Sequence, residues 1–326
     1  MNQANIMNHT DIVLLNWNSK EDTIECLESL YKMKGVSFRV FVCDNGSTDD
    51  SLPCLSRWAT EQGVSHIEVR PGPQQIPEQT KLVLIDNGAN LGFAAGNNTG
   101  IALALGQPET SHVWLLNNDT TVEQDSLETL HRRMAQDQAI GACGSLIKFY
   151  DDHSVIQAVG GCEFNYTTGV ASESLGRYLP DSTVLDVADY EARMDYISGA
   201  AMLLSREYLE TVGLMEESYF LYYEEIDWAI RAKGLFKLAI AVDSIVYHKE
   251  GSAIGSASFQ RAASPTSEFY LMRSKLRFMA RHLPKNLPIA YAATFAQALN
   301  RFRRGQLETG VAVLKAMVQR STGMAA

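Results

Sequence analysis

The chain has 326 residues, of which 46% are hydrophobic and 20% are charged. This composition is typical of a soluble globular protein and excludes a disordered one. Its formal net charge of -10 argues against a general nucleic-acid-binding protein.

The first half of the chain alternates strand and helix signals. Apolar runs typical of strands occur at 11–17, 38–44, 66–70, 81–87, 112–118 and 139–149, and helical patterns lie between them at 19–33, 49–61, 97–105 and 125–136. Such alternation predicts an α/β fold with a mostly parallel central sheet and helices on both faces.

The second half is less regular. Residues 151–195 show scattered Gly, Ser, Thr and acids with little periodicity, which predicts a loop-rich insertion where substrate specificity could reside. Strand-like runs follow at 196–205 and 238–248, and the chain is helical and basic in pattern from Pro265. We therefore expect a main domain at 1–264, with halves at about 1–120 and 121–264, and a helical extension at 265–326.

Ligands of open parallel sheets bind beyond the carboxyl ends of the strands, and the residues there are polar in this chain. Asp44 and Asn45 precede a Gly-Ser turn, so Asp44 can accept hydrogen bonds from a base or ribose, although a plain strand-turn-helix connection explains the segment equally well. Residues 87–100 hold four glycines and four asparagines. Gly92 and Gly96 permit close backbone approach to a ligand, and the helix start can face an anion. The segment matches neither the dinucleotide fingerprint nor a phosphate loop.

The strand at 112–118 ends in Asn117 and Asn118, with Asp119 next. A carboxylate at a strand end, with a neutral oxygen ligand two residues earlier, suits a hard divalent cation that also binds diphosphate oxygens. An ordinary Asn-Asp turn is the alternative. His248 closes a later strand, where a histidine is more often structural than a ligand. The ligand hypothesis for His248 is strengthened because a metal bound to Asp119 needs a second protein ligand.

The run YFLYYEEIDW sets Glu224, Glu225 and Asp227 among aromatic residues. Ionised side chains there are costly unless they are paired, protonated or facing a cleft. The alternative is an ordinary helix start, with Asp227 paired to Arg231 one turn later. In a helix, Glu224 and Asp227 share one face and Glu225 points about 100° away, so the three cannot share one role.

Seven segments, taken in order, resemble the family 2 inverting glycosyltransferases, in particular bacterial rhamnosyltransferases. They are LLNWN, VCDNGSTDDS, ANLGFAAGNNTGI, VWLLNNDT, YISGAAMLL, YFLYYEEIDWAIRAKG and VYHKEGSA. The resemblance implies the A-type glycosyltransferase fold. It also implies transfer of a sugar from a nucleotide diphosphate sugar to a saccharide or lipid-linked saccharide acceptor, with a divalent cation, Mg²⁺ or Mn²⁺, as cofactor.

The resemblance also implies roles for particular residues. Those implied at the nucleotide sugar are Asn16, Asp44, Asn45, Asn90, Gly92, Phe93, Gly96, Asn117 and Asn118. Asn117 and Asp119 match the family's paired-aspartate metal motif, but Asn117 replaces the first aspartate, which makes Asp119 the expected ligand. His248 would be a further contact to the metal or the diphosphate.

The family's base is usually the second acid of a Glu-Asp pair, and that position is Glu225 here, with Asp227 the next candidate. We expect Glu225 to face the acceptor, while Glu224 and Asp227 hold the local structure through Arg231 and backbone donors. Aromatic surroundings and like-charged neighbours should raise the pKa of the base.

The acceptor is expected beside the segment Ser198, Gly199 and Ala200, where a glycine lets a sugar approach the backbone.

Two other functions remain open. A sugar-phosphate nucleotidyltransferase usually has a glycine-rich basic loop after its first strand, whereas this chain has LNWNSKED. A non-catalytic scaffold of the same fold is favoured by Asn117 in place of an acid.

The C-terminal part of the chain is basic. Residues 268–326 hold ten Lys and Arg against Glu268 and Glu308. A helical cap with solvated basic residues explains this pattern, and so does docking to an anionic membrane surface. The apolar stretch at 287–299 is too short to span a bilayer.

The expected location is cytoplasmic, with peripheral membrane contact as an option. The five cysteines form no CxxC pair and are odd in number, which fits reduced thiols. The first residues lack the basic segment and apolar core of a signal peptide.

Overall fold

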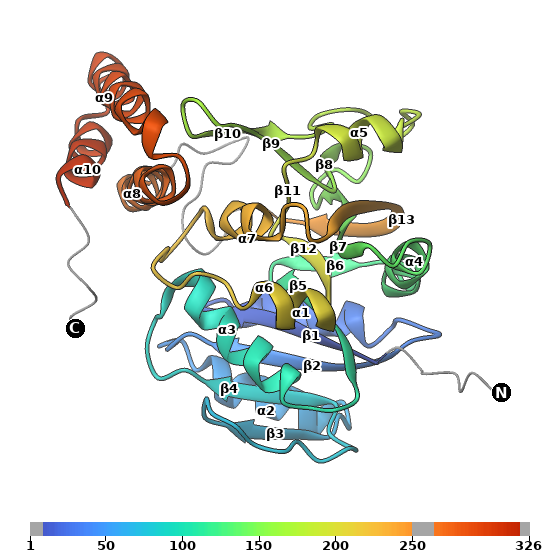
Figure 1. Cartoon of the computed structure of the whole chain (residues 1–326). Coiled ribbons are helices and arrows are strands. Elements are labelled where there is room, and N and C mark those ends of the chain that lie inside the picture. The colour runs from blue at the N-terminus through green and yellow to red at the C-terminus, as the bar shows by residue number, and fades with distance from the viewer. Residues whose placement is uncertain (1–8, 250–263, 320–326) are drawn as a thin grey trace.

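The computed structural model describes residues 9–249 and 264–319. Within them a large mixed sheet has the strand order β3-β4-β2-β1-β5-β12-β7-β13-β6, with β8 paired to β7 (Figure 1). Its strands are β1 (His9–Asn16), β2 (Ser37–Asp44), β3 (His66–Val69), β4 (Leu82–Asp86), β5 (Thr110–Asn117), β6 (Thr120–Val122), β7 (Ile140–Phe149), β8 (Ile156–Val159), β12 (Ala201–Ser205) and β13 (Lys237–His248). A small sheet contains β9 (Gly161–Asn165), β10 (Val170–Ser174) and β11 (Tyr196–Ile197).

The expected mostly parallel sheet is confirmed in the N-terminal half. Strands β3, β4, β2, β1 and β5 are all mutually parallel, and β7 runs parallel to β13. Three antiparallel strands, β12, β6 and β8, complete the second half. The alternation of strand and helix signals predicts parallel pairing, so it did not predict the direction of these strands: β8 follows β7 through a short loop, whereas β12 and β6 pair with strands distant in the sequence.

Helices cover both faces of the large sheet. They are α1 (Lys20–Leu30), α2 (Ser51–Glu61), α3 (Gly92–Leu105), α4 (Ser126–Met134), α5 (Val187–Arg193), α6 (Arg206–Val212) and α7 (Glu224–Ala232). Successive side chains of β1 point to opposite faces of the sheet, as the two-residue period of a strand requires. Ile12 and Leu14 pack with α1, α2 and α4, whereas Val13 packs with α3, α6 and α7.

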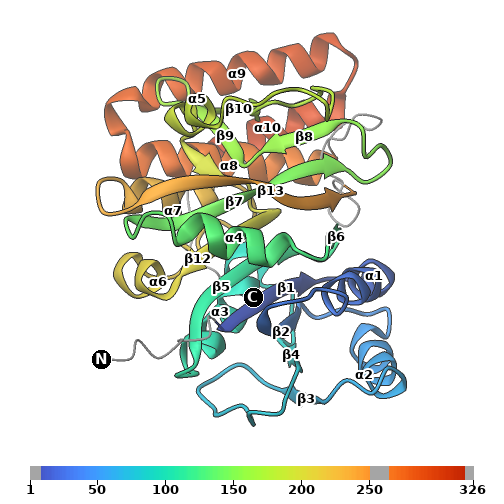
Figure 2. The ribbon, with the colours of Figure 1, turned by 90° about the vertical axis from the view of Figure 1, so that its right-hand side faces the viewer.

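The C-terminal extension is helical, as predicted. It contains α8 (Pro265–His282), a short 3-10 helix η1 (Pro284–Asn286), α9 (Leu287–Arg303) and α10 (Leu307–Val318). Ser264 caps α8 by accepting a hydrogen bond from the Ser267 backbone. The three long helices form one cluster beside the sheet, with α8 nearest α7 (Figures 1 and 2). Within the described ranges no helix combines the length and apolarity needed to cross a membrane.

Two expected elements have different bounds in the structure. The helix expected at 97–105 begins five residues earlier, at Gly92. The run at 196–205 is not one strand, because it is interrupted at Ser198, Gly199 and Ala200. There the Ser198 N–H donates to the Gly160 carbonyl, and the chain changes from the small sheet to the large one.

We expect the protein to lose stability as the pH falls from 6.5 to about 4 because of a histidine pair. The rings of His112 and His131 lie 5.1 Å apart, and burial lowers the pKa of each from 6.5 to about 4. The unfolded chain therefore binds these protons at a higher pH than the folded chain does, so acidification through this range favours unfolding. Urea denaturation across the range measures the loss. In the variant His112→Asn/His131→Asn the pH dependence should be weaker, and an unchanged dependence would contradict the assignment.

Candidate active site

The carboxyl ends of three strands bring the predicted polar residues to one edge of the sheet. Strand β1 lies between β2 and β5, with Asn16 beside Asp44 and Leu15 beside Asn117. The side chains of Asn16 and Asp44 are almost fully buried and joined by a hydrogen bond of 2.7 Å from Asn16 Nδ2 to Asp44 Oδ2. The other oxygen of Asp44 accepts from the Ser47 backbone at 2.9 Å. Asp44 is thus fixed at the strand end and shapes the turn after it.

Asn45 organises the glycine-rich segment that follows β4. Its Nδ2 donates to Oδ1 of Asn90 at 3.0 Å and to the Gly92 carbonyl at 3.1 Å. Its Oδ1 accepts from the Leu91 backbone at 3.2 Å and from Asn87 at 3.3 Å. Because Asn45 is 2% exposed and uses both ends of its amide within the chain, it holds the loop that surrounds the edge of the sheet.

The structure packs Gly92 and Gly96 closely against other parts of the chain, and their expected role beside a ligand stays a prediction. Gly92 has φ +84°, and a Cβ there would overlap the carbonyl and ring of Phe220. A Cβ on Gly96 would lie 2.6 Å from Leu15 Cδ1. Two backbone N–H groups at the start of α3 already have partners. The Gly92 N–H donates to Asn90 Oδ1 at 3.0 Å, and the Phe93 N–H donates to the Phe220 carbonyl at 2.8 Å. An anion would find only the later N–H groups of this turn.

Asp119 and His248 come together, although 129 positions separate them in the sequence. His248 Nε2 lies 3.2 Å from Asp119 Oδ1 and 3.4 Å from Asn117 Nδ2. His248 Nδ1 lies 2.7 Å from Gln157 Oε1, an acceptor. Nδ1 therefore donates to Gln157, and Nε2 faces Asp119 and Asn117, a position from which it can ligate a cation when it carries no proton.

These side chains fit a divalent cation as a partial ligand set. A carboxylate oxygen and an imidazole nitrogen are both accepted by Mn²⁺, and the remaining positions of an octahedral ion would be left to a diphosphate and water. Among the residues that the structure describes, no cluster of three or more His, Cys, Asp or Glu could hold a metal. Gln157 orients the histidine, and sequence reasoning missed it because it lies in the irregular insertion.

Asn118 faces away from this pair. Its Nδ2 donates to Thr23 Oγ1 of α1 at 2.9 Å, and Thr23 in turn donates to Asn16 Oδ1 at 2.9 Å. The amide therefore links the end of β5 to the end of β1. A second link was not predicted: the ammonium of Lys249 binds Asp22 of α1 at 2.6 Å, and its backbone N–H donates to the Asp119 carbonyl at 3.0 Å.

The three acids of the cluster have different surroundings, as helical spacing predicts. Glu224 and Asp227 are 2% and 0% exposed, whereas Glu225 is half-buried. Burial raises the pKa of Glu225 above its ordinary value of 4.5. Burial, and then the charge of Glu225, raise the pKa of Glu224 further, and Oε2 of Glu224 has no hydrogen-bond partner in the described residues. A protonated Glu224 is the form that this site favours.

Glu225 lies directly against the interruption between β11 and β12. A Cβ added to Gly199 would overlap its carboxylate, so Glu225 fills the room that this glycine leaves. The neighbouring Ala200 carbonyl accepts from the Asn117 N–H at 3.0 Å. This chain of contacts connects Glu225 to the strand end that carries Asp119.

Asp227 is bound by side chains from two helices. The predicted pair with Arg231 is present, with Arg231 Nε 2.7 Å from Oδ2. His282, the last residue of α8, places Nε2 2.6 Å from Oδ1. Tyr219 donates a longer hydrogen bond to the same oxygen at 3.4 Å. With both oxygens engaged and no exposed surface, Asp227 joins α7 to α8.

The segment before α7 is strained and held by α8. Tyr222 and Tyr223 have φ values of 68° and 75°, which are unfavourable for residues other than glycine. The hydroxyl of Tyr222 lies 2.6 Å from Ser267 Oγ, and Ser274 Oγ donates to the Leu221 carbonyl at 2.8 Å. These contacts turn the chain sharply, so that α7 begins at the acids.

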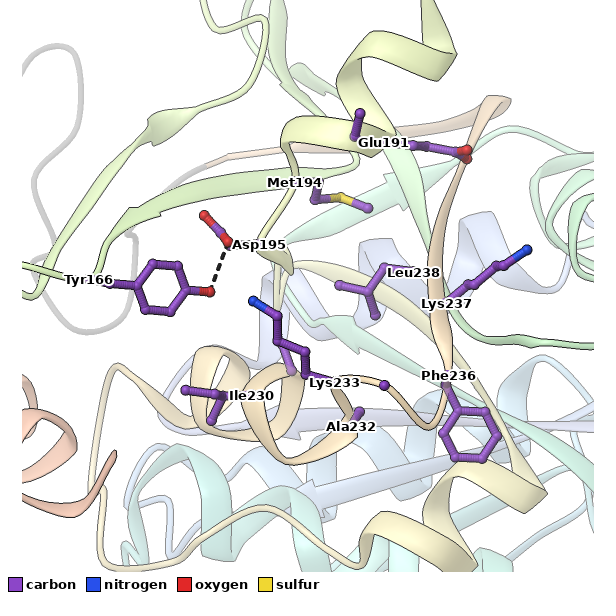
Figure 3. Close-up of a pocket in the computed structure, with 13 residues that line it drawn as sticks. Tyr166, Glu191, Met194, Asp195, Ile230, Ala232, Lys233, Phe236, Lys237 and Leu238 are labelled. Atoms are coloured by element: carbon purple, nitrogen blue, oxygen red, sulfur yellow. Dashed lines mark hydrogen bonds between the residues drawn. The ribbon is translucent and has the colours of Figure 1, made fainter. Parts of the chain in front are cut away.

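A cavity of about 400 Å³ is lined by the end of α7, the start of β13 and residues 191–195, and none of the predicted site residues lines it (Figure 3). Its polar side chains have partners within the chain: Tyr166 donates to Asp195 at 2.8 Å, the Lys233 ammonium lies 5.3 Å from the Tyr166 ring, and Glu191 and Lys237 pair with Arg133 and Asp137. The polar cluster at the sheet edge is therefore the candidate site, rather than this cavity.

Comparison with known proteins agrees with the architecture. The family description "Glycosyl transferase family 2" matches residues 11–212, which is more than half of the chain. The chain belongs to glycosyl transferase family 2.

One relative within the reach of sequence comparison is the low-salt glycan biosynthesis hexosyltransferase Agl10 of Haloferax volcanii. It is 25% identical over 240 residues, which cover 71% of this chain and 64% of that protein. The family 2 chain thus spans less than two thirds of the length of this relative.

Solved structures of other glycosyltransferases share the fold. The mannosyltransferase PcManGT of Pyrobaculum calidifontis, in complex with GDP-Man and Mn²⁺, has a TM-score of 0.54 at 16% identity and covers 95% of this chain and 86% of its own. S. aureus TarS 1-349 in complex with UDP-GlcNAc has a TM-score of 0.54 at 15% identity, covering 94% and 79%. GalNAc-T7 with UDP, GalNAc and Mn²⁺ has a TM-score of 0.58 at 13% identity, covering 85% and 48%. At these identities the likeness establishes the fold alone, and it confirms the expected A-type glycosyltransferase fold.

Replacing Gly199 with Ala should displace the Glu225 carboxylate, because the new methyl group would occupy its position. We expect slow hydrolysis of a nucleotide sugar to fall by about a hundredfold, since a displacement of about an ångström is enough for such a loss. Affinity for the nucleotide sugar should remain within about twofold, as measured by calorimetry. Gly106→Ala at the end of α3 is the matched control. Wild-type hydrolysis by Gly199→Ala would contradict the importance of this contact.

Proposed function

We propose that the protein is an inverting glycosyltransferase that moves a sugar from a nucleotide diphosphate sugar to a saccharide or lipid-linked saccharide acceptor. The observation that carries the proposal is the position of Glu225: a half-buried carboxylate of raised pKa lies against Gly199, one backbone hydrogen bond away from the strand end of Asp119. Membership of family 2 supports sugar transfer. A rhamnose donor is proposed from the sequence resemblance only.

The donor would bind at the edge formed by β1, β2 and the start of α3. Asp44 and Asn16 would contact the base and ribose, while Asn45 and Asn90 hold the loop that carries Phe93. Two of the similar structures contain GDP-Man and UDP-GlcNAc, which supports a nucleotide sugar as the class of donor. Asn117 and Asn118 would complete the pocket on the side of β5.

Glu225 would act as the base. The acceptor hydroxyl attacks the anomeric carbon from the face opposite the diphosphate, the bond to the diphosphate oxygen breaks, and the hydroxyl proton passes to Glu225. One displacement inverts the configuration at that carbon. A pKa raised by burial makes Glu225 a stronger base than an exposed glutamate. Asp227 is less suited, because Arg231 and His282 already bind both of its oxygens.

The acceptor would lie beside Ser198, Gly199 and Ala200, next to the carboxylate. Glu224, buried and favoured in the protonated form, would support the start of α7 rather than take the proton.

Asp119 and His248 would hold a divalent cation, Mg²⁺ or Mn²⁺, with Asn117 beside them. When bound, the ion would supply positive charge to stabilise the departing diphosphate. Gln157 orients the His248 ring so that Nε2 is directed at this position. Mn²⁺ in two similar structures supports the class of cofactor.

A non-catalytic scaffold that binds nucleotide sugars is the second candidate function. It is favoured by Asn117, which stands where the family has an acid, and by the two-residue ligand set in the described chain. We propose a cytoplasmic location for either function. Slow metal-dependent hydrolysis of a nucleotide sugar separates the enzyme from the scaffold.

Glu225→Gln tests the base. The amide keeps the shape of the side chain but cannot accept a proton, so hydrolysis or transfer should fall by about a thousandfold while affinity for the nucleotide sugar stays within about twofold. Glu207→Gln, at an exposed position on α6, is the matched control. Full activity of the Glu225 variant would place the base elsewhere, and Asp227→Asn would then be measured.

Asp119→Ala tests the cation site. In the wild type, Mn²⁺ should strengthen binding of a nucleotide diphosphate by about tenfold or more, since the ion contacts both protein and phosphate oxygens. In the variant this gain should disappear, whereas binding without metal should be little changed. Titrations with and without Mn²⁺ measure both quantities. An equal metal effect in the two proteins would remove Asp119 from the proposed ligand set.

A further inference from the structure

The outer face of α9 is apolar along most of its length. Its exposed positions recur at helical spacing, and from Pro288 to Leu299 those on this face carry no charge: Pro288, Ile289, Ala292, Phe295, Ala296 and Leu299. The side chains of Ile289, Phe295 and Leu299 are 46%, 48% and 48% exposed. A surface helix of a soluble protein ordinarily turns such a face toward the core.

Exposed apolar residues gather on this part of the molecule. Among the described residues, ten large hydrophobic side chains are exposed, and six of them lie on α9 and α10. On α10 these are Leu307, Val311 and Val318, which are 63%, 43% and 80% exposed. The other four are scattered over the remaining chain, so the concentration on two packed helices distinguishes this region.

The ends of these helices are basic. Lys285 precedes α9, Arg303 and Arg304 end it, and Lys315 lies on α10; all four are exposed. Helix α9 contains no acidic residue, and Glu308 is the one exposed acid between positions 264 and 319. An apolar face flanked by lysine and arginine is the pattern of a helix that lies in a membrane interface.

We propose that the exposed apolar residues of α9 and α10, together with Lys285, Arg303, Arg304 and Lys315, form a docking surface for an anionic lipid bilayer. The apolar side chains enter the boundary between headgroups and acyl chains, and the basic ones contact lipid phosphates. Contact is peripheral, because no described helix is long and apolar enough to cross the bilayer.

A second copy of the chain fits this surface less well. In a symmetric dimer the same patch would face itself, and the basic residues at its edges would meet like charges. An anionic bilayer complements them, and the acidic remainder of the protein would be repelled from the membrane and kept in the aqueous phase.

Helix α8 connects this docking surface to the candidate active site, and the consequence for the acceptor rests on the proposed function. Helix α8 binds α7 through His282 and Asp227 on one side and packs against α10 through Met272 and Val313 on the other. Figure 1 shows α8 between α7 and this pair of helices. A lipid-linked acceptor would thus be presented at a surface joined through α8 to Glu225.

Vesicle sedimentation without any sugar tests the docking surface separately from the transfer reaction. The full chain should sediment with vesicles of phosphatidylcholine and phosphatidylglycerol at low salt, and not with phosphatidylcholine alone. The double variant Phe295→Asp/Leu299→Asp should bind at least about tenfold more weakly, since two apolar contacts are replaced by repelled charges. Arg303→Glu/Arg304→Glu should also weaken binding and make it less sensitive to salt.

Leu235→Asp is the matched control, because Leu235 is 59% exposed but belongs to the turn between α7 and β13. It should bind vesicles as the wild type does, and circular dichroism should show the same fold for every variant. Failure of the wild type to bind anionic vesicles, or equal binding by the Phe295/Leu299 variant, would overturn the proposal. A wild-type dimer that this variant converts to a monomer, without vesicle binding, would instead assign the face to contact between copies.

Discussion

The candidate site depends on one buried carboxylate. Asp227 has no exposed surface, and its two oxygens bind Arg231 on its own helix and His282 at the end of α8. A buried charge of this kind is costly unless it is paired, so these contacts tie the two helices together. The pairing sets the rotation of α7. With Asp227 turned inward, Glu225 lies on a different side of the helix and faces the interruption at Gly199.

The second requirement is that distant strand ends meet at one edge of the sheet. Parallel pairing of β1 with β2 and β5 aligns Asn16, Asp44 and Asn117, and β13 carries His248 to Asp119. The segment before α7 joins this edge to the base: its Phe220 carbonyl accepts from the Phe93 N–H at the start of α3. The donor-side loop and the proposed base are therefore held by one continuous set of contacts.

Much of this arrangement was accessible from the sequence, because strand alternation predicts a parallel sheet and a parallel sheet gathers its carboxyl ends. The helical spacing of the acids likewise predicts that Glu225 differs from Glu224 and Asp227. Contacts between distant segments were not predictable. The pair of Asp227 and His282 spans 55 positions, and Gln157 lies in a segment without periodicity. The start of α3 was missed because Gly92 and Gly96 are unusual in a helix, and their packing partners Phe220 and Leu15 are distant in sequence. The basic character of the C-terminal segment was visible from its composition, but only the structure shows which apolar side chains of α9 are exposed to solvent.

The central claim is a single displacement with Glu225 as base, and the stereochemistry of the reaction tests it most directly. Proton NMR of nucleotide-sugar hydrolysis, recorded before the released sugar equilibrates, identifies the anomer that forms first. The account predicts the anomer opposite to that of the donor, because water replaces the diphosphate from the opposite face. Release of the same anomer as in the donor would contradict direct displacement and the role proposed for Glu225.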